Sequence, residues 1–173
     1  MSGTDVHAHR ALRDVLGRFP TGVTVITALS LPDRRPIGLT VNSFSSVSLD
    51  PPLALWSLSR RSSNLEQFPV GKAHVIHILS ERQAAMALRF ANSRIEKFDG
   101  IDHRPDADTG APAIEGCVAR LFCEVAMVTE GGDHRVIISR VLRHEITDRA
   151  PLVFYRGAFM GLAPAGTIDE PGR

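Results

Sequence analysis

The sequence has little of what would direct a protein to a membrane or a nucleic acid. Its formal net charge is only +1, and neither sign forms a long block, so no strong field attracts a phosphate backbone or a lipid surface. It has no run of ~18 apolar residues for a spanning helix. The amino terminus also lacks the basic start and apolar stretch of an export signal. We therefore expect a cytoplasmic protein with no membrane or nucleic-acid partner.

Cysteines and metal-ligand patterns are equally scarce. The two cysteines, Cys117 and Cys123, are six residues apart in one expected strand, which places their Cα atoms roughly 20 Å apart. We expect two buried free thiols, as suits a reducing compartment. The histidines lack zinc-type spacing, so we expect no metal. Glycine-rich dinucleotide and nucleoside-triphosphate loops and the G-x-S-x-G hydrolase turn are also missing.

The 173 residues fit one domain, since single domains usually contain ~100 to 200 residues. Hydrophobic residues make up 43% of the chain and charged residues 23%, an ordinary globular composition. We expect one domain over 1–173, with its core at about 8–162 and a flexible Gly/Pro-rich tail at 163–173.

Hydrophobic periodicity indicates a mainly β protein. Apolar residues at helical spacing predict a helix over 5–19 that packs its apolar face on another part of the protein, and Ser80 with Gln83 forms a capping box before a helix over 81–92. Residues 93–113 have the composition of a long loop. The β-branched or alternating segments predict strands at 22–29, 36–44, 53–59, 74–80, 117–128, 135–146 and 151–157. We expect a closed or nearly closed antiparallel barrel of six to seven strands with two to three flanking helices.

The densest polar cluster follows the second strand, before the Asp50-Pro51-Pro52 corner. Its side chains offer many hydrogen-bond donors and few charges, which suits the rim of a flavin, but a solvated connection has the same composition. The cluster consists of Thr40, Asn42, Ser43, Ser45, Ser46 and Ser48.

Two further features suggest a ligand. Ser63 and Glu66 form an S-x-x-E capping box after Arg60 and Arg61, so a helix start with nearby guanidinium groups could hold a phosphate or could simply be capped. His134 follows a double glycine that can turn the chain toward a ligand, although a histidine at a turn is often only solvated.

Three segments together resemble the short-chain flavin reductase-like family, whose fold is the FMN-binding split barrel. They are FPTGVTVIT, PIGLTVNSFSSVSLDPPLALWSLSRRSSN and GGDHRVIISRV, and the resemblance extends over about 8–162. It implies a homodimer that binds FMN or FAD, with FAD favoured, in a groove shared between subunits. It also implies NADH, favoured over NADPH, as electron donor.

The resemblance assigns roles residue by residue. His134 is expected to face the nicotinamide, as its orienting group or as a proton donor. Phosphate binding is expected from Ser57, Arg61, Ser62 and Ser63. The isoalloxazine and ribityl chain are expected to contact Thr40, Asn42, Ser43, Ser45, Ser46, Val47 and Ser48. A second group is expected to lie near the same pocket: Thr21, Tyr155, Arg156 and Gly157. The sequence departs from the family's usual residues at two positions, with His77 where the family often has Asn and Ser139 where it often has Gly. Both positions are expected to support the fold and not to contact the ligand.

The implied activity is an NAD(P)H:flavin oxidoreductase that supplies diffusible reduced flavin to a monooxygenase of aromatic or natural-product metabolism. The chemistry is the cofactors' own, which agrees with a sequence that has no catalytic triad. The alternatives are a non-catalytic flavin- or haem-binding protein on the same barrel, and an oxidase of the pyridoxamine phosphate type, which should need a more basic phosphate pocket. A purely structural dimeric barrel is a third.

Overall fold

The computed structural model describes residues 3–162, so the tail predicted to be flexible lies outside the described residues. The main element is a seven-stranded antiparallel sheet in the order β3-β2-β6-β9-β10-β5-β4. Its strands are β2 (Thr24–Leu29), β3 (Pro36–Val41), β4 (Ser45–Leu49), β5 (Pro52–Ser59), β6 (Ala73–Ile78), β9 (Ala119–Gly131) and β10 (His134–Ile146). The mainly β, antiparallel prediction is confirmed.

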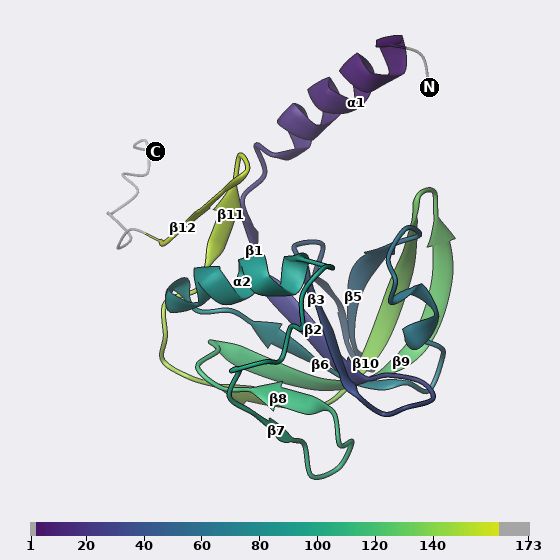
Figure 1. Cartoon of the computed structure of the whole chain (residues 1–173), viewed down its shortest axis with the longest axis vertical. Coiled ribbons are helices and arrows are strands. Elements are labelled where there is room, and N and C mark those ends of the chain that lie inside the picture. Colours follow the sequence, from purple (N-terminus) through teal and green to yellow (C-terminus); the bar gives the residue numbers. More distant parts are fainter. Residues whose placement is uncertain (1–2, 163–173) are drawn as a thin grey trace, which may run out of the picture.

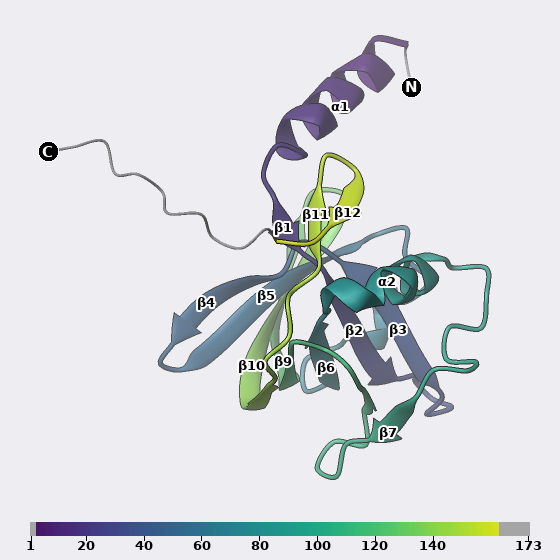
Figure 2. The ribbon, with the colours of Figure 1, turned by 90° about the vertical axis from the view of Figure 1, so that its left-hand side faces the viewer.

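The sheet curls until its edge strand β3 approaches β5, the strand next to the other edge. Ser43, just after the edge strand β3, accepts a hydrogen bond of 2.9 Å from the backbone N–H of Ser57 in β5. Figure 2 shows β4 and β5 extending to one side of the body, while β2 and β3 lie on the other. The result is a barrel with a seam between β3 and β5.

Two smaller sheets complete the fold. One contains β1 (Thr21–Gly22), β11 (Val153–Tyr155) and β12 (Ala158–Met160), and the other pairs β7 (His103–Pro105) with β8 (Pro112–Ile114). Placing 151–157 in the main sheet was therefore wrong, because β11 pairs with β1 and β12. The prediction of a long loop over 93–113 missed two short strands, since β7 and β8 form there.

The core lies on both faces of β2, whose residues Thr24 to Ala28 are all buried. One cluster inside the barrel includes Ile26 and Trp56, and a second beneath α2 (Ala84–Ala91) includes Val25 and Phe90. The hydroxyls of Thr24 and Thr27 donate to the carbonyls of Val41 and Pro112, so neither is buried without a partner. A strand covered on both faces explains the continuous β-branched run in the sequence.

The capping box before α2 is confirmed: Gln83 Oε1 accepts a 3.0 Å hydrogen bond from the Ser80 backbone N–H. A short 3₁₀ turn, η2 (Glu81–Gln83), separates this cap from α2. The capping box at Ser63 was wrong, because only the single turn η1 (Leu65–Gln67) follows and its N-cap is Asn64, without a side-chain cap. Three residues provide too few backbone hydrogen bonds to sustain a helix there.

The first helix, α1 (Gly3–Leu16), does not pack its apolar face on another part of the protein as predicted. It points away from the barrel and reaches it only through the segment before β1 (Figure 1). Leu12, Val15 and Leu16 are exposed by 57%, 68% and 64%. The apolar periodicity was real, but this face lacks a partner within the described chain. No helix among residues 3–162 is long and apolar enough to cross a membrane.

Both cysteines are free and buried, as predicted, and burial raises the pKa of Cys117 to about 11 and of Cys123 to about 12. Cys117 nevertheless precedes β9. The expected alternation of buried and exposed side chains also fails near the end of that strand, where Met127 is exposed. The cause is a register shift opposite Ile138 and Ser139 that leaves one extra residue in β9.

Two histidines on β6 are fully buried and hydrogen-bonded at both ring nitrogens. His77 Nδ1–H donates to the Val25 carbonyl at 3.0 Å, and its Nε2 accepts from the Ile114 N–H at 3.0 Å. His74 Nδ1–H donates to the Lys72 carbonyl at 3.2 Å, and its Nε2 lies 3.0 Å from the Ser139 hydroxyl. Both rings therefore act as neutral scaffold groups, and burial lowers the pKa of each to about 4.

Gly38 in β3 is required by close packing. A Cβ at this position would lie 2.6 Å from Phe90 Cε1 and 3.1 Å from the Ile26 carbonyl oxygen. We expect Gly38→Ala to lower the free energy of unfolding by about 1–3 kcal/mol, measured by urea denaturation, because fully buried Phe90 cannot move without disturbing the core. Gly22→Ala, where a Cβ meets nothing within 4 Å, is the control. Equal midpoints for the two variants would contradict this account.

Candidate functional site

A groove of about 490 Å³ lies along the seam of the barrel. It runs between the end of β3 and the outward-facing serines of β5, with the loop after β5 at one side and the end of α2 at the other. Its lining residues are Leu39, Thr40, Val41, Asn42, Ser43, Ser57, Leu58, Ser59, Arg61, Ser62, Ser63, Asn64, Phe90, Ala91, Ser93, Lys97 and His134. Eight of the predicted site residues are in this set.

Two of these eight also hold the groove's walls together. Thr40 Oγ1–H donates to the Ala87 carbonyl in α2 at 2.7 Å, and Ser43 Oγ accepts the Ser57 N–H across the seam. Their hydroxyl oxygens still have lone pairs for a ligand. The groove's width is thus fixed by side chains that also line it.

The loop after β5 forms one end of the groove. Its turns are fixed by short-range hydrogen bonds, from the Arg61 N–H to Ser59 Oγ at 3.2 Å and from the Asn64 N–H to Ser62 Oγ at 3.2 Å. Neighbouring Arg60 pairs with Glu130 outside the groove. Arg61 is absent from the ion pairs of the described residues, so its guanidinium is available for an anion.

His134 begins β10 directly opposite Ser59 of β5. Its Nδ1–H donates to Asp133 Oδ1 at 2.7 Å, and this bond holds the pKa of Asp133 below its usual range. The bond fixes the tautomer and leaves Nε2 for another partner. The tight turn predicted from the two glycines therefore does deliver a histidine to the groove.

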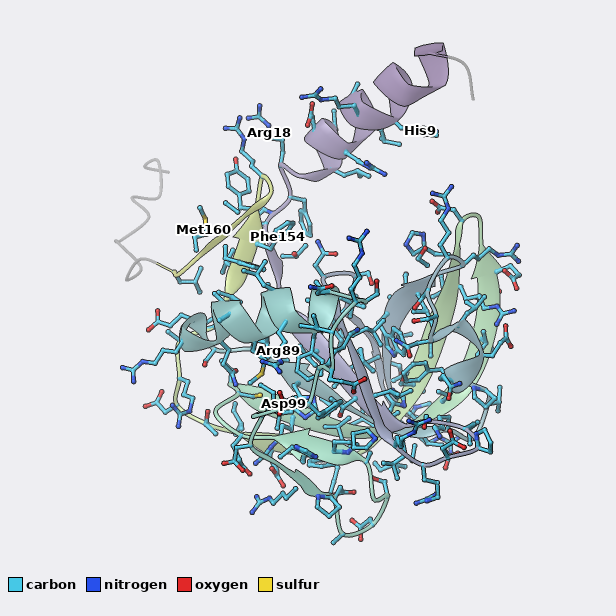
Figure 3. All side chains as sticks on the ribbon, in the orientation of Figure 1. His9, Arg18, Arg89, Asp99, Phe154 and Met160 are labelled. Atoms are coloured by element: carbon cyan, nitrogen blue, oxygen red, sulfur yellow. The ribbon has the colours of Figure 1, made fainter. Side chains whose placement is uncertain are left out.

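Sequence reasoning missed the segment after α2, which contributes Ser93 and Lys97 to the groove. Lys97 Nζ donates to the carbonyls of Gly38 at 2.8 Å and Phe90 at 2.9 Å, and burial lowers its pKa. Arg89 donates to three carbonyls of the same segment, including that of Asp99, which lies close to it in Figure 3. The charged residues around Lys97 did not mark it as a site residue, because any exposed loop has a similar composition.

The groove is a positive, donor-rich environment. Among the described residues, its charged lining groups are Arg61 and Lys97, and no carboxylate lines it. The remaining polar groups are hydroxyls, amides and the His134 ring. Such a set suits a ligand with a phosphate and several carbonyl or imine acceptors.

Four of the predicted residues lie outside the groove because the cluster after β3 is only partly a loop. Ser45, Ser46, Val47 and Ser48 belong to the edge strand β4, which pairs with β5. The lining of the groove ends at Ser43 on this side. The serine-rich composition concealed a strand, and the structure does not bring these four residues to the groove.

A second hollow, of about 770 Å³, lies beyond Asn42, which lines both spaces. It contains predicted residues Thr21, Arg156 and Gly157, whereas Tyr155 lines neither space. The other lining residues, which sequence reasoning missed, are Arg13, Asp14, Leu16, Gly17, Arg18, Phe19 and Phe154. The sequence therefore grouped residues that the structure divides between two neighbouring spaces.

Comparison with known proteins agrees with this geometry. A family model described as a flavin reductase like domain matches residues 16–163. The chain belongs to this family. It is 45% identical over 150 residues to the FMN reductase (NADH) SmoA of Agrobacterium fabrum, covering 87% of this chain and 84% of that protein. It is 38% identical over 167 residues to the flavin-dependent monooxygenase reductase subunit HsaB of Mycobacterium tuberculosis, covering 95% and 88%.

Solved structures of flavin reductases share the fold of this family member. The NADH:FAD oxidoreductase SgcE6 of Streptomyces globisporus, in complex with NAD and FAD fragments, superimposes with a TM-score of 0.83 at 35% identity. The match covers 91% of this chain and 94% of that one. The family resemblance in the sequence is thereby confirmed.

Proposed function

We propose that the protein is an NADH:flavin oxidoreductase that supplies diffusible reduced flavin to a partner monooxygenase. The observation that carries this proposal is the seam groove, whose lining among residues 3–162 has hydroxyl and amide donors, an Arg61 without an ion pair, and no carboxylate. Its volume is within the range of ligand pockets. Membership of the flavin reductase-like family, whose relatives include reductase subunits of monooxygenases, supports the same activity.

The groove residues fit a flavin in one direction. Ser63 and Asn64 also line a small hollow beside Pro36, Ile37 and Gly38, so the Arg61 loop lies toward the start of β3. Asn42 follows the end of β3. The phosphate would therefore bind Arg61, Ser62 and Ser63, and the ring would lie between Asn42, Ser57 and His134.

The chain's own residues orient and contain the reactants. When NADH and flavin are bound, one hydride passes from nicotinamide C4 to flavin N5, and with one proton the products are NAD⁺ and reduced flavin. With Nδ1–H bound to Asp133, His134 Nε2 would accept a hydrogen bond from the nicotinamide amide, or, when the ring carries a second proton, donate that proton. The rigid walls formed by the Ser43 and Thr40 bonds keep both rings at reactive distance.

We expect His134→Ala to lower kcat/KM for NADH by at least about tenfold, since one hydrogen bond contributes ~1 kcal/mol and a proton-transfer group contributes more. Steady-state oxidation of NADH with saturating FMN measures it. His134→Asn keeps a donor but cannot titrate, so recovery of KM without recovery of kcat assigns the proton role. Wild-type kinetics in the alanine variant would remove His134 from the mechanism.

The proposed assembly is a homodimer. The exposed apolar face of α1, with Leu12, Val15 and Leu16, supports a protein partner because surface patches of this kind usually mark interfaces. We propose that the chain acts as one domain and in the cytoplasm, in agreement with its two buried free thiols.

One assay tests the proposed function. NADH absorbance is followed with purified protein while FMN and FAD are added in turn, and we expect oxidation that requires added flavin. A protein that binds flavin but oxidises no NADH with either flavin would instead be a binding protein.

A further inference from the structure

One wall of the seam groove has little backbone structure of its own. It is the segment 93–99, which follows α2 and contributes Ser93 and Lys97 to the groove. The segment belongs to no helix or strand. Among the described residues, its one backbone–backbone hydrogen bond runs from the Ile101 N–H to the Phe98 carbonyl at 3.1 Å. Side chains must therefore hold this wall in place.

Arg89, in the last turn of α2, provides most of that support. Its Nε–H donates to the Lys97 carbonyl at 2.8 Å. Its Nη2 group donates to the carbonyls of Glu96 at 3.1 Å and Asp99 at 2.5 Å, and Figure 3 shows Arg89 close to Asp99. The planar guanidinium group can serve several fixed acceptors at once, whereas an ammonium group is a single point of charge. Arg89 thus fixes the path of the backbone from 96 to 99.

This use of an arginine differs from ordinary helix capping. A cation in the last turn of a helix usually interacts with the helix's own final carbonyls. The acceptors of Arg89 instead lie seven, eight and ten residues further along the chain. Arg89 also takes part in no ion pair among residues 3–162, although Glu96 and Asp99 both carry carboxylates. A half-buried charge that binds three carbonyls of one irregular segment indicates a role in positioning that segment.

Lys97 passes this position on to the groove. Its Nζ donates to the carbonyl of Gly38, in the edge strand β3, and to that of Phe90, at the carboxyl end of α2. Carbonyls at a helix end lack partners within the helix, so the ammonium group satisfies one of them. An ammonium group has three donors, and two are used here, which leaves one for a ligand. The backbone of this groove residue is held by Arg89.

An aromatic contact anchors the segment independently of Arg89. The Phe98 ring packs edge-on against Phe90 at 5.1 Å and against His103 at 4.9 Å between ring centroids. Phe90 is fully buried in the core beneath α2. Removing the Arg89 guanidinium should therefore loosen the path of the segment without detaching it from the protein.

The segment lies at one end of the groove. Ser93 and Lys97 line both the groove and the small hollow beside Gly38, and so do Ser63 and Asn64 of the loop after β5. The segment and the loop therefore face each other across the end assigned to the flavin phosphate. Asn42 and His134, assigned to the ring, do not line this small hollow.

We propose that Arg89 is a positioning residue for flavin binding. It does not line the groove, and it acts by holding the backbone at 96–99 so that Ser93 and Lys97 stay opposite the Arg61 loop. The identity of the ligand rests on the proposed reductase function. The affinity for the phosphate end of the flavin is thus set in part by a side chain outside the groove.

The test uses Arg89→Gln, with Arg94→Gln as the matched control. Arg94 is exposed on the segment itself, and its guanidinium makes no hydrogen bond within the described chain, so the control removes the same charge without removing the support. Quenching of flavin fluorescence should show FMN binding at least about fivefold weaker in Arg89→Gln, the effect of losing about one hydrogen bond. Riboflavin, which has no phosphate, should bind both variants as it binds the wild type.

Two further readouts separate positioning from general damage. With saturating FMN, kcat and the KM for NADH should match the wild type in Arg89→Gln, whereas the KM for FMN should rise at least about fivefold. Hydrogen–deuterium exchange of the flavin-free protein should be faster at the amides of 93–99 in this variant and unchanged in β2.

Arg89→Lys keeps the charge but loses the planar group, so it should show part of the loss in FMN affinity, and it carries the same test should Arg89→Gln not fold. Wild-type FMN affinity in Arg89→Gln would overturn the proposal, as would a matching loss for riboflavin. Equal weakening in Arg94→Gln would assign the effect to charge alone and also overturn it. Failure of the reductase proposal is distinct, because wild type would then oxidise no NADH with any flavin, whereas the titrations need no oxidation.

Discussion

Lowering the pH from 7 to 4 should remove about 3 kcal/mol of folding free energy for each of the two buried histidines, His74 and His77. Burial lowers the pKa of both rings to about 4 in the folded protein, whereas an unfolded histidine titrates near 6.5. The unfolded chain therefore binds protons first, and this stability, fully present above pH 6.5, is lost as the pH falls through 4. Urea denaturation at several pH values measures it.

The number of protons that the wild-type protein takes up on unfolding can be measured directly, so this test does not depend on a variant. Near pH 5 it should be about two, one for each ring. His77→Gln keeps an acceptor for the Ile114 N–H and should reduce the uptake by about one. A wild-type uptake near zero between pH 6.5 and 4.5 would show that the rings are not held neutral.

Changing Arg61 to Gln should weaken FMN binding by about 10- to 100-fold, the loss expected for a charged hydrogen bond to phosphate. Binding of riboflavin, which has no phosphate, should not change. Quenching of flavin fluorescence on titration with protein measures both ligands. The fold should be unaffected, because the ion pairs described here do not involve this guanidinium.

The adjacent arginine provides the control. Arg60 donates to Glu130 at 3.0 Å and lies outside the groove, so Arg60→Gln should leave the affinity for FMN unchanged. Equal loss in the two variants would indicate a general effect of positive charge on the loop. Equal loss for FMN and riboflavin would place the phosphate elsewhere.

The long strands could be predicted from the sequence because burial leaves a pattern in it. The run in β2 is apolar or β-branched throughout since both faces are covered, whereas β5 alternates in burial, and its sequence shows this only in the second half, over Trp56 to Ser59. Short elements leave no such pattern: β4 is rich in serine, and β7 and β8 have three residues each. The strands exist through pairing with distant partners, which local composition does not encode.

The site was predictable where backbone geometry demands particular residues, as at the Gly131-Gly132 turn that places His134. Lys97 could not be found in this way, since its role depends on the carbonyls of Gly38 and Phe90, distant in the sequence. The apolar stripe of α1 correctly predicted a helix, but its apolar face is exposed among the described residues, so the burial it indicated is not found there. The position of Arg18 beside the hollow likewise could not be predicted, because the hollow forms only where the β11–β12 segment packs next to it.

The seam between β3 and β5 has a consequence for traffic through the molecule. The inside of the barrel is filled by the core around Ile26 and Trp56, so the ligand groove lies along the seam, where β3 meets β5 beside the bond between Ser43 and Ser57. A carrier can enter sideways and depart by the same route with the framework at rest. Exchange of a flavin would therefore require no opening of the barrel itself.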